Sequence, residues 1–269
     1  MTETFEFWAS YLTNGRHLNW YASFQYTVIA ALLGGAFALL FGIGGAALRN
    51  AHATPLRLIG TIYINMVRGI PDVLFFIFFP LAFEQLVELF IAQGACPPGS
   101  AAAVGTWPPC PEANWFLGTG DYLMLASVSL GIVYGAFTAN VISGALNSVP
   151  RGQLEAARAF GMSRSQVLWR VHIRQMWIYA LPGLSNCWLL LIKATSLLSL
   201  LQITDIVRGA NLLGSPNFSR SAGVVHGDWR WGYYLALVLF YILVTYLSEK
   251  AFAALTRWAS RGMPVSRRT

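Results

Sequence analysis

The side chains best suited to binding a small polar ligand lie inside long apolar stretches of this sequence. Asp72 and Lys193 carry opposite charges, and at such a depth each can pair with the opposite charge of a solute. Amide and hydroxyl groups in the same stretches can donate and accept hydrogen bonds. The candidate ligand-binding residues are therefore Asp72, Asn140, Asn186, Lys193 and Thr195.

Most of these residues also have a purely structural interpretation. Asp72 can form a salt bridge with Arg68 or cap a broken helix. Lys193 can extend its ammonium group to an interface or pair within the protein. Asn140 and Asn186 can bond across a helix interface instead of contacting a solute. The sequence leaves both interpretations open.

Patterns typical of catalysis or metal binding do not occur. The histidines fall on different loops, so no His/Cys cluster has metal-ligand spacing. Neither a G-x-x-x-x-G-K-[ST] phosphate loop nor a G-x-G-x-x-G motif occurs. The apolar stretches also lack the clustered Ser/Lys, Asp/Asp or His/Glu pair of an intramembrane enzyme. We therefore expect no catalytic residue, no metal and no cofactor on this chain.

Composition places the candidate residues in a membrane. Charged residues make up 11% of the chain, against roughly 25% in an average soluble domain, and apolar residues make up 56%. A membrane-spanning helix needs about 20 mainly apolar residues, and five segments qualify. The predicted fold is an all-α polytopic membrane protein with one transmembrane domain over residues 1–269. Its spans are roughly 24–48, 58–83, 122–146, 177–202 and 231–255.

Glycine and proline pairs are expected to interrupt two of these spans. Gly69 with Pro71 lies in the second span, and Pro182 with Gly183 lies in the fourth. Broken helices at membrane depth are tolerated where they line a cavity or are buried in protein, so they fit a solute path.

Basic residues alternate between the connecting segments. The segments after the first and third spans and the C-terminal tail are rich in arginine, whereas the loop 84–121 contains acidic residues and no basic one. The positive-inside rule then predicts an outer N-terminus, a cytoplasmic C-terminus and an outer loop at 84–121. Arginines and anionic lipid headgroups account for the net charge of +7 without nucleic acid. The tail arginines are Arg257, Arg261, Arg267 and Arg268.

A polar segment, SVPRGQLEAARAFG at 148–161, lies between the third and fourth spans, on the predicted cytoplasmic side. Pro150 is suited to starting a helix, and an acidic side chain in the first turns is favoured by the helix dipole. Alanines keep the surface flat, and the final glycine permits a sharp reversal or a close approach by another chain. We predict a docking helix at about 151–164. Its contact residues are expected to be Gly152, Glu155, Ala156, Ala157 and Gly161.

Two cysteines, Cys96 and Cys110, lie in the predicted outer loop, while Cys187 lies inside the fourth span. A disulfide that closes the outer loop is consistent with an oxidising compartment. We predict a bond between Cys96 and Cys110, and two free thiols are the alternative.

The docking segment resembles the E-A-A-x-x-x-G motif of bacterial ABC importer permeases. The similarity extends over residues 134–207, which include A-L-P-G-x-x-N and L-x-K-x-T-x-L-x-S-L elements, and to VRGIPDVLFFIFF at 67–79 with Tyr63 before it. These strings resemble the polar amino-acid subfamily. The R-G-[IV]-P-D form is shared with the Q-type permeases of histidine, lysine–arginine–ornithine and opine importers.

This resemblance implies a type I importer in the bacterial inner membrane. Two similar permeases would lie side by side in the bilayer, each docking a cytoplasmic coupling helix on one subunit of an ATPase dimer that binds ATP and Mg²⁺. A periplasmic binding protein would deliver an amino-acid solute. Closure of the ATPase dimer would then switch the pore between two rigid-body states.

The sequence departs from the subfamily at two places. Members often carry a T-E-x-x-R-G string in the third span, where this chain has Asn140 and Ser143, so we expect no ion pair there. A proline common about 13 residues after the motif glycine is replaced by Arg174, which predicts a less kinked entry into the fourth span.

The sequence predicts the transported solute less narrowly than it predicts the class of transporter. The R-G-I-P-D string and Asp72 as a counter-charge favour a basic amino acid or an opine, while glutamate or glutamine import is the alternative. A stand-alone channel or an intramembrane enzyme is a remote alternative. A pathway of five spans is thin, which favours pairing with a second permease.

Overall fold

The computed structural model describes residues 2–96, 107–201, 203–218 and 225–261 of the chain. Two predicted features lie partly outside these residues: the outer loop, at 97–106, and the arginine-rich tail, at 262–269, which includes Arg267 and Arg268. The described residues are helical apart from connecting turns, with one isolated bridge between Asn217 and His226.

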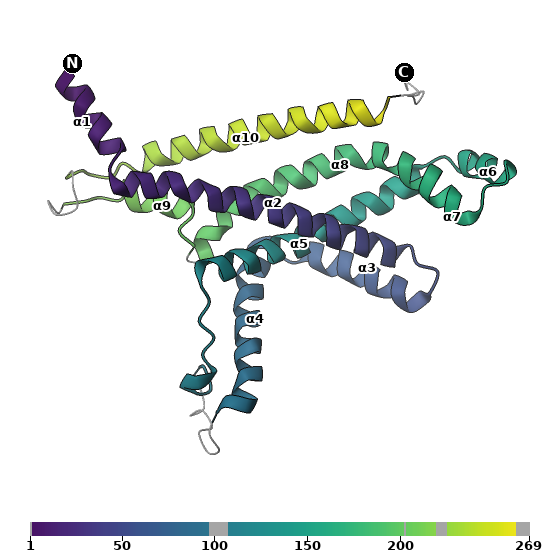
Figure 1. Ribbon diagram of the computed structural model, residues 1–269, viewed down its shortest axis with the longest axis horizontal. Helices are drawn as coiled ribbons and strands as arrows, with labels where there is room; N and C mark the ends of the chain where they lie inside the picture. The colour runs from purple at the N-terminus through teal and green to yellow at the C-terminus, as the bar shows by residue number, and fades with distance from the viewer. Residues whose placement is uncertain (1, 97–106, 202, 219–224, 262–269) are drawn as a thin grey trace.

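The chain folds into long helices joined by short helical pieces (Figure 1). The α-helices are α1 (Thr2–Leu12), α2 (Gly15–Arg49), α3 (Thr54–Gly69), α4 (Asp72–Ala95), α5 (Thr119–Ser148), α6 (Arg151–Ala159), α7 (Arg164–Gln166), α8 (Ile173–Ala194), α9 (Ile206–Gly214) and α10 (Arg230–Ala259). Shorter pieces are the 3₁₀ turns Pro111–Ala113 and Thr195–Leu201 and the π-helical segment Val167–His172.

Five segments are long and apolar enough to cross a membrane, as predicted. They are Gly15–Arg49, Asp72–Ala95, Thr119–Ser148, Arg164–Leu201 and Arg230–Ala259. The all-α, five-span prediction is therefore confirmed. The first and fourth segments begin earlier than expected, because polar residues extend each helix beyond its apolar run.

The second span differs from its prediction. The predicted interruption at Gly69 and Pro71 is confirmed, because α3 ends at Gly69 and α4 begins at Asp72. The predicted bounds 58–83 are wrong, because the helix long and apolar enough to cross a membrane here is α4, Asp72–Ala95. Ile70 has an extended backbone, with φ −87° and ψ 134°, as expected for a residue whose following proline disfavours the α region. Helix α4 then continues to Ala95, so the first part of the predicted outer loop 84–121 is helical.

In the fourth span, by contrast, the predicted interruption is absent. Pro182 and Gly183 do not interrupt it, because α8 runs without a break from Ile173 to Ala194. Gly183 instead permits close packing, since a Cβ at this position would lie 2.6 Å from Cγ1 of Val141 on α5. The departures from α geometry lie at the two ends of the span, in the π-helical segment Val167–His172 and the 3₁₀ turn Thr195–Leu201.

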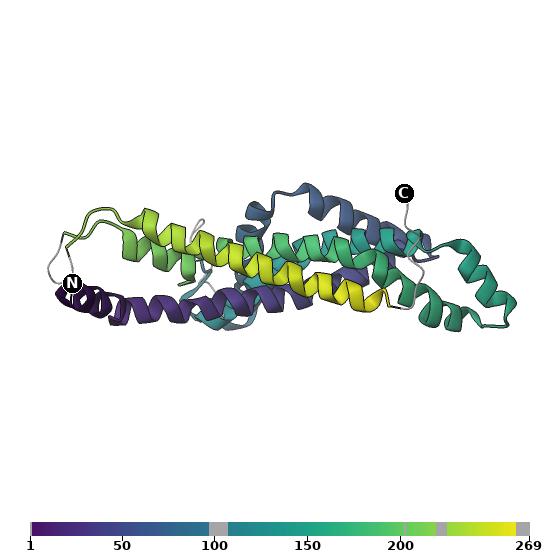
Figure 2. The same cartoon turned by 90° about the horizontal axis from the view of Figure 1, so that it is seen from above.

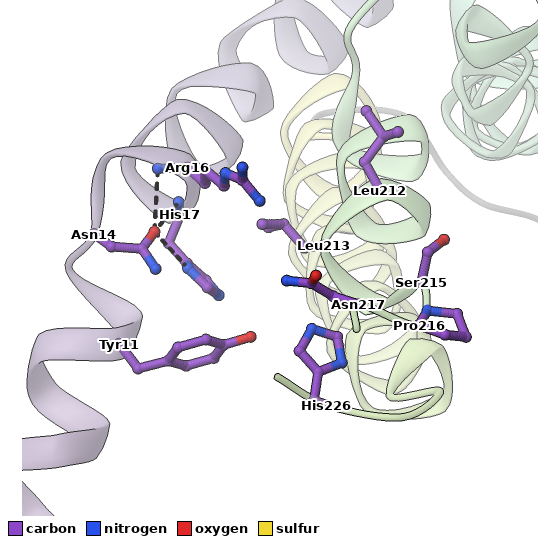
Figure 3. A pocket seen from close by; sticks show the side chains of 10 residues that line it. All are labelled: Tyr11, Asn14, Arg16, His17, Leu212, Leu213, Ser215, Pro216, Asn217 and His226. Atoms are coloured by element: carbon purple, nitrogen blue, oxygen red, sulfur yellow. Dashed lines mark hydrogen bonds between the residues drawn. The ribbon is translucent and has the colours of Figure 1, made fainter. Parts of the chain in front are cut away.

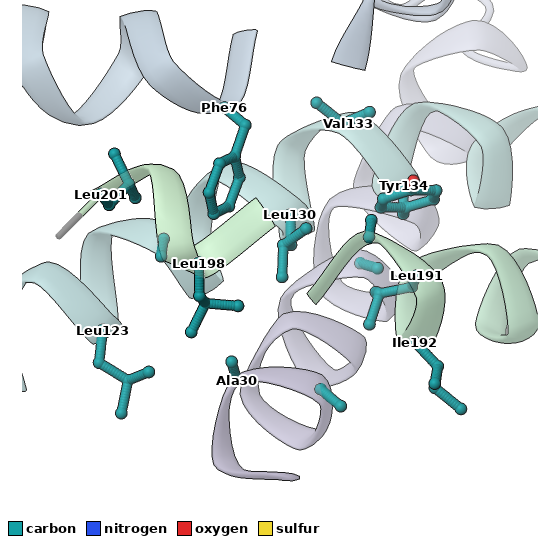
Figure 4. Close-up of a cluster of buried hydrophobic side chains, with 14 of the residues drawn as sticks. Ala30, Phe76, Leu123, Leu130, Val133, Tyr134, Leu191, Ile192, Leu198 and Leu201 are labelled. Atoms are coloured by element: carbon teal, nitrogen blue, oxygen red, sulfur yellow. The ribbon is translucent and has the colours of Figure 1, made fainter. Parts of the chain in front are cut away.

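Helix α5 is the centre of the bundle and the most buried of the five spans. It packs against α2, α3, α4 and α8, while α10 is the least buried span. Figure 4 shows the core where α2, α4, α5 and α8 meet, with Phe76, Leu130 and Leu191 almost fully buried. Contact between α2 and α5 requires small residues. A Cβ at Gly42 would lie 2.3 Å from Cγ2 of Thr138.

The two ends of the bundle carry different elements, and Figures 1 and 2 agree on the arrangement. Helices α1 and α9 lie at one end, together with the N-terminus. The α2–α3 connection, α6, α7 and the end of α10 lie at the other. Helix α4 projects from the side of the bundle (Figure 1). The arginine-rich connections predicted to share one side of the membrane are thus gathered at one end.

Candidate functional site

Helix α6 occupies the predicted docking segment but is shorter than expected, ending at Ala159. Pro150 is its N-cap, and Glu155 lies beyond the first turn, so the dipole contributes less to that carboxylate than predicted. Gly161 ends the helix with φ +79°. Its N–H donates to the Arg158 carbonyl at 2.9 Å, and the Met162 N–H donates to the Ala157 carbonyl at 3.2 Å, which together form a Schellman motif.

One face of α6 packs on the chain itself, and the other is open. Ala157 is only 7% exposed, and Leu154 packs against the core around α5 and α8. Gly152, Glu155 and Ala156 are exposed. The predicted alanine face is therefore divided, because Ala157 holds α6 to its own chain while Ala156 points outward.

The π-helical segment Val167–His172 lies between α6 and α8, within the first part of the fourth span, and it packs on α6 and α7 and leads directly into α8. One of its ends is tied to the bundle by a hydrogen bond of 2.9 Å between His172 Nε2 and the Leu146 carbonyl of α5. π-helical turns occur often at functional sites. The entry to this span is irregular even though Arg174 replaces the subfamily's proline.

Asp72 lies at the break between α3 and α4, in the first turn of α4. The Tyr134 hydroxyl on α5 donates a hydrogen bond of 3.1 Å to Asp72 Oδ2. Among the described residues Asp72 forms no ion pair with Arg68, whose guanidinium lies 5.3 Å from the centre of the Phe137 ring. The predicted salt-bridge alternative is absent there, and the carboxylate remains exposed.

Asn140 forms part of a link between α2 and α5. Arg49 Nη1 donates to Asn140 Oδ1 at 2.9 Å, and Asn50 Nδ2 donates to Ser143 Oγ at 3.2 Å. The two positions where the subfamily carries an acid and an arginine therefore hold a polar bridge to the end of α2. The sequence predicted no ion pair here but gave no signal for Arg49 as the partner.

Three further candidates lie on the fourth span. Thr195 is fully buried; its hydroxyl donates to the Ile192 carbonyl at 2.6 Å and lies 3.3 Å from the Tyr241 hydroxyl on α10. Asn186 and Lys193 are exposed. Lys193 lines a largely apolar groove between α8 and α10 that Glu249 also lines. The five pathway candidates are thus distributed over separate surroundings rather than gathered in one pocket of this chain.

The predicted outer loop is fastened to α4 by the disulfide that the sequence predicted and by further contacts that it did not reveal. Cys96 and Cys110 form a disulfide in the structure, with Cα atoms 5.9 Å apart. Glu88 is only 4% exposed; its carboxylate accepts from Trp107 Nε1 at 2.5 Å and from the Trp115 backbone N–H at 3.1 Å. Its burial was missed because an isolated glutamate near a span end gives no signal for a partner.

The described residues contain no group of three or more His, Cys, Asp or Glu side chains placed to hold a metal ion. The candidate site consists of two features: helix α6, whose outer face is exposed at one end of the bundle, and the break between α3 and α4 beside the core.

Known proteins resemble this chain over most of its length. A family model described as "Binding-protein-dependent transport system inner membrane component" matches residues 38–261. The histidine/lysine/arginine/ornithine permease HisQ of Escherichia coli is 31% identical, over 88% of this chain and 87% of its own length. The octopine permease OccQ of Rhizobium radiobacter is 27% identical, over 88% of both chains.

Solved structures agree at the level of the fold. A crystal structure of an amino acid ABC transporter with histidines matches with a TM-score of 0.65 and 20% identity, covering 88% of this chain and 92% of that one. An inward-facing structure of the MetNI methionine ABC transporter matches with a TM-score of 0.56. The chain belongs to the family of inner membrane components of binding-protein-dependent transport systems, as a multi-pass, non-catalytic permease subunit whose ATPase is a separate protein.

Proposed function

We propose that this chain is the permease of an ATP-driven importer for polar amino acids, with basic amino acids or opines as its solutes. The proposal rests on the solutes that its relatives are named for: histidine, lysine, arginine and ornithine in one case and octopine in another. A further relative, ArtQ of Escherichia coli, is an arginine permease at 27% identity over 82% of this chain.

In this proposal α6 is the coupling helix, and its exposed face docks on the ATPase. The Schellman motif at Gly161 fixes where the helix ends and turns the chain back toward the bundle. Ala157 anchors the inner face of α6, so Gly152, Glu155 and Ala156 remain to contact the partner. Because the π-helical segment joins this region to α8, a displacement of α6 is passed to the fourth span.

The arginine-rich end of the bundle is the cytoplasmic end in this proposal, with the N-terminus outside. Support comes from the positive-inside rule, since α6 and the α2–α3 connection lie at the same end (Figure 1). A second, similar permease, an ATPase dimer with ATP and Mg²⁺, and a periplasmic binding protein complete the importer. The second permease would cover polar groups such as Asn186 and Lys193, which are exposed on this chain alone.

Asp72 is the proposed counter-charge for a cationic solute. Its carboxylate is exposed at the helix break, and one oxygen is oriented by the Tyr134 hydroxyl while the other has no hydrogen-bond partner among the described residues. Asn140 and Thr195 contribute less to the path in this proposal, because each is already bonded within the chain.

Reconstitution of the importer in proteoliposomes tests the solute proposal. We expect Asp72→Asn to weaken transport of arginine about tenfold relative to a neutral amino acid, the loss typical of a hydrogen bond to a charged group. Glu112→Gln, which removes an exposed carboxylate from the outer loop, is the matched control. Unchanged affinity and unchanged ranking of basic over neutral solutes in the Asp72 variant would contradict its role, and preferred uptake of glutamate or glutamine would contradict the basic solute.

A further inference from the structure

At the end of the bundle opposite α6, a polar pocket of about 220 Å³ lies between the start of α2 and the segment after α9. Figure 3 shows Arg16, His17 and His226 around it, with Tyr11, Asn14 and Asn217. Among the residues that the structure describes, no acidic side chain lines the pocket. The nearest one in sequence, Asp228, is paired with Arg230, so the pocket has a positive character.

The pocket is built on buried, oriented side chains. His17 is 1% exposed. Its Nδ1 lies 2.9 Å from Asn14 Oδ1, an acceptor, so Nδ1 carries a proton, and its Nε2 lies 2.8 Å from the Tyr233 hydroxyl. That hydroxyl lies 3.3 Å from the hydroxyl of Tyr11. A continuous chain of polar groups therefore holds the wall of the pocket in place.

A second histidine leaves one nitrogen open toward the pocket. His226 is 8% exposed, and its Nδ1 lies 2.6 Å from the Gly227 carbonyl, so Nδ1 is the protonated nitrogen. Its ring stacks on Trp229 with centres 4.3 Å apart. Nε2 of His226 has no hydrogen-bond partner among the described residues. The guanidinium of Arg16 supplies a permanent positive charge on the same wall.

An apolar groove of about 540 Å³ adjoins this pocket. Tyr11 lines both, and Tyr233, which bonds His17 on the pocket side, also lines the groove. Tryptophans dominate the rest of its wall, and Trp231 is 72% exposed at its edge. Tryptophan and tyrosine prefer the boundary between hydrocarbon and lipid headgroups, which is where the start of a membrane-spanning helix lies.

We propose that the pocket and the groove together bind one anionic phospholipid, with the headgroup phosphate beside Arg16 and His226 and an acyl chain along the tryptophan groove. Charge complementarity selects the phosphate, because the described lining of the pocket holds the Arg16 guanidinium and hydrogen-bond donors and no acidic side chain. The adjoining groove selects a lipid over a free anion, since a free anion leaves the apolar wall uncovered. The site is independent of the transported solute and of the proposed direction of insertion.

Native mass spectrometry of the intact assembly, released from nanodiscs, tests the site. The assembly retains phosphatidylglycerol in preference to phosphatidylcholine. Arg16→Gln lowers phosphatidylglycerol retention about fivefold, the ratio equivalent to about 1 kcal/mol for one basic residue beside anionic lipid. Trp231→Ala lowers retention of both lipids. Arg164→Gln, an exposed arginine on α7 at the other end, leaves retention unchanged.

Inorganic phosphate at millimolar concentration distinguishes the two sources of the anion. Failure of phosphate to displace the lipid is the expected result. Displacement by phosphate, together with normal lipid retention in Trp231→Ala, would show a site for free anions and overturn the proposal. Equal retention of phosphatidylglycerol by Arg16→Gln and the unmodified chain would also overturn it. Both substitutions lie on exposed side chains, so folded, inserted protein is expected and is checked by its elution as an intact assembly.

Discussion

Gly161 offers a test of the proposed coupling helix, because substitutions at this residue can separate the effect of the backbone conformation from that of side-chain size. Its φ of +79° lies in the left-handed region, where an L-residue costs about 1–2 kcal/mol. A Cβ built at this position meets nothing within 4 Å in this chain, so a substitution adds no clash inside the permease. Gly161→Ala should therefore destabilise the Schellman turn by about 1 kcal/mol, and Gly161→Val should cost more because valine is β-branched.

Asparagine is the matched control, because it tolerates the left-handed region far better than alanine while carrying a larger side chain. We expect transport and solute-stimulated ATP hydrolysis in proteoliposomes to fall in the order Gly, Asn, Ala, Val at residue 161, with about a fivefold loss for 1 kcal/mol. Normal uptake in the alanine and valine variants would refute the reasoning. An asparagine variant worse than the alanine variant would also refute it, because side-chain size against the ATPase would then decide the effect.

Two further predictions concern the loops. Burial raises the pKa of the Asp205 carboxyl to about 6 from its ordinary 3.8, and its Oδ2 is buried without a hydrogen-bond partner. The folded protein therefore binds a proton here more tightly than the unfolded chain, so its stability should fall as the pH rises from 4 through 6. Asp205→Asn keeps a side-chain oxygen that accepts from the Arg208 N–H at the N-cap. It removes the cost of burying the charged carboxylate, about 3 kcal/mol, so it should raise the melting temperature at pH 8 and not at pH 4. An equal effect at both pH values would count against the buried charge. Thiol labelling should modify Cys96 and Cys110 only after reduction, and Cys96→Ser should expose Cys110 to labelling without reductant; equal labelling with and without reductant would exclude the bond.

Hydropathy and charge placement predicted much of this fold because both act locally along the chain. The five apolar runs of the sequence correspond to the five spans of the structure. The arginine-rich connections were predicted to share one side of the membrane, and α6 and the α2–α3 turn do lie at the same end of the bundle. The position of α6 also followed from its polar composition. These features depend on which residues favour the bilayer and which favour water, and that preference can be read from residue type alone.

Breaks and partners were predicted less well because they depend on packing. Pro71 breaks the second span, where the preceding Ile70 is extended, but Pro182 is accommodated inside α8. Sequence alone could not distinguish the two prolines. The sequence leaves Asn140 open between contacting the solute and bonding across a helix interface; the structure shows the interface bond, to Arg49, a residue 91 positions away. The sequence predicts Ala157 on the docking face, whereas the structure buries it, at 7% exposure, against the rest of its own chain.

Photo-crosslinking from residue 156 in native membranes tests the central claim most directly. Ala156 is exposed on α6, so a photoreactive amino acid at this position should form an adduct with a P-loop ATPase, identified by mass spectrometry. The same amino acid at exposed Leu12 of α1, at the opposite end of the bundle, should give no such adduct. An inserted chain that yields no ATPase adduct from residue 156, or yields it equally from residue 12, would contradict the assignment of α6 as the coupling helix.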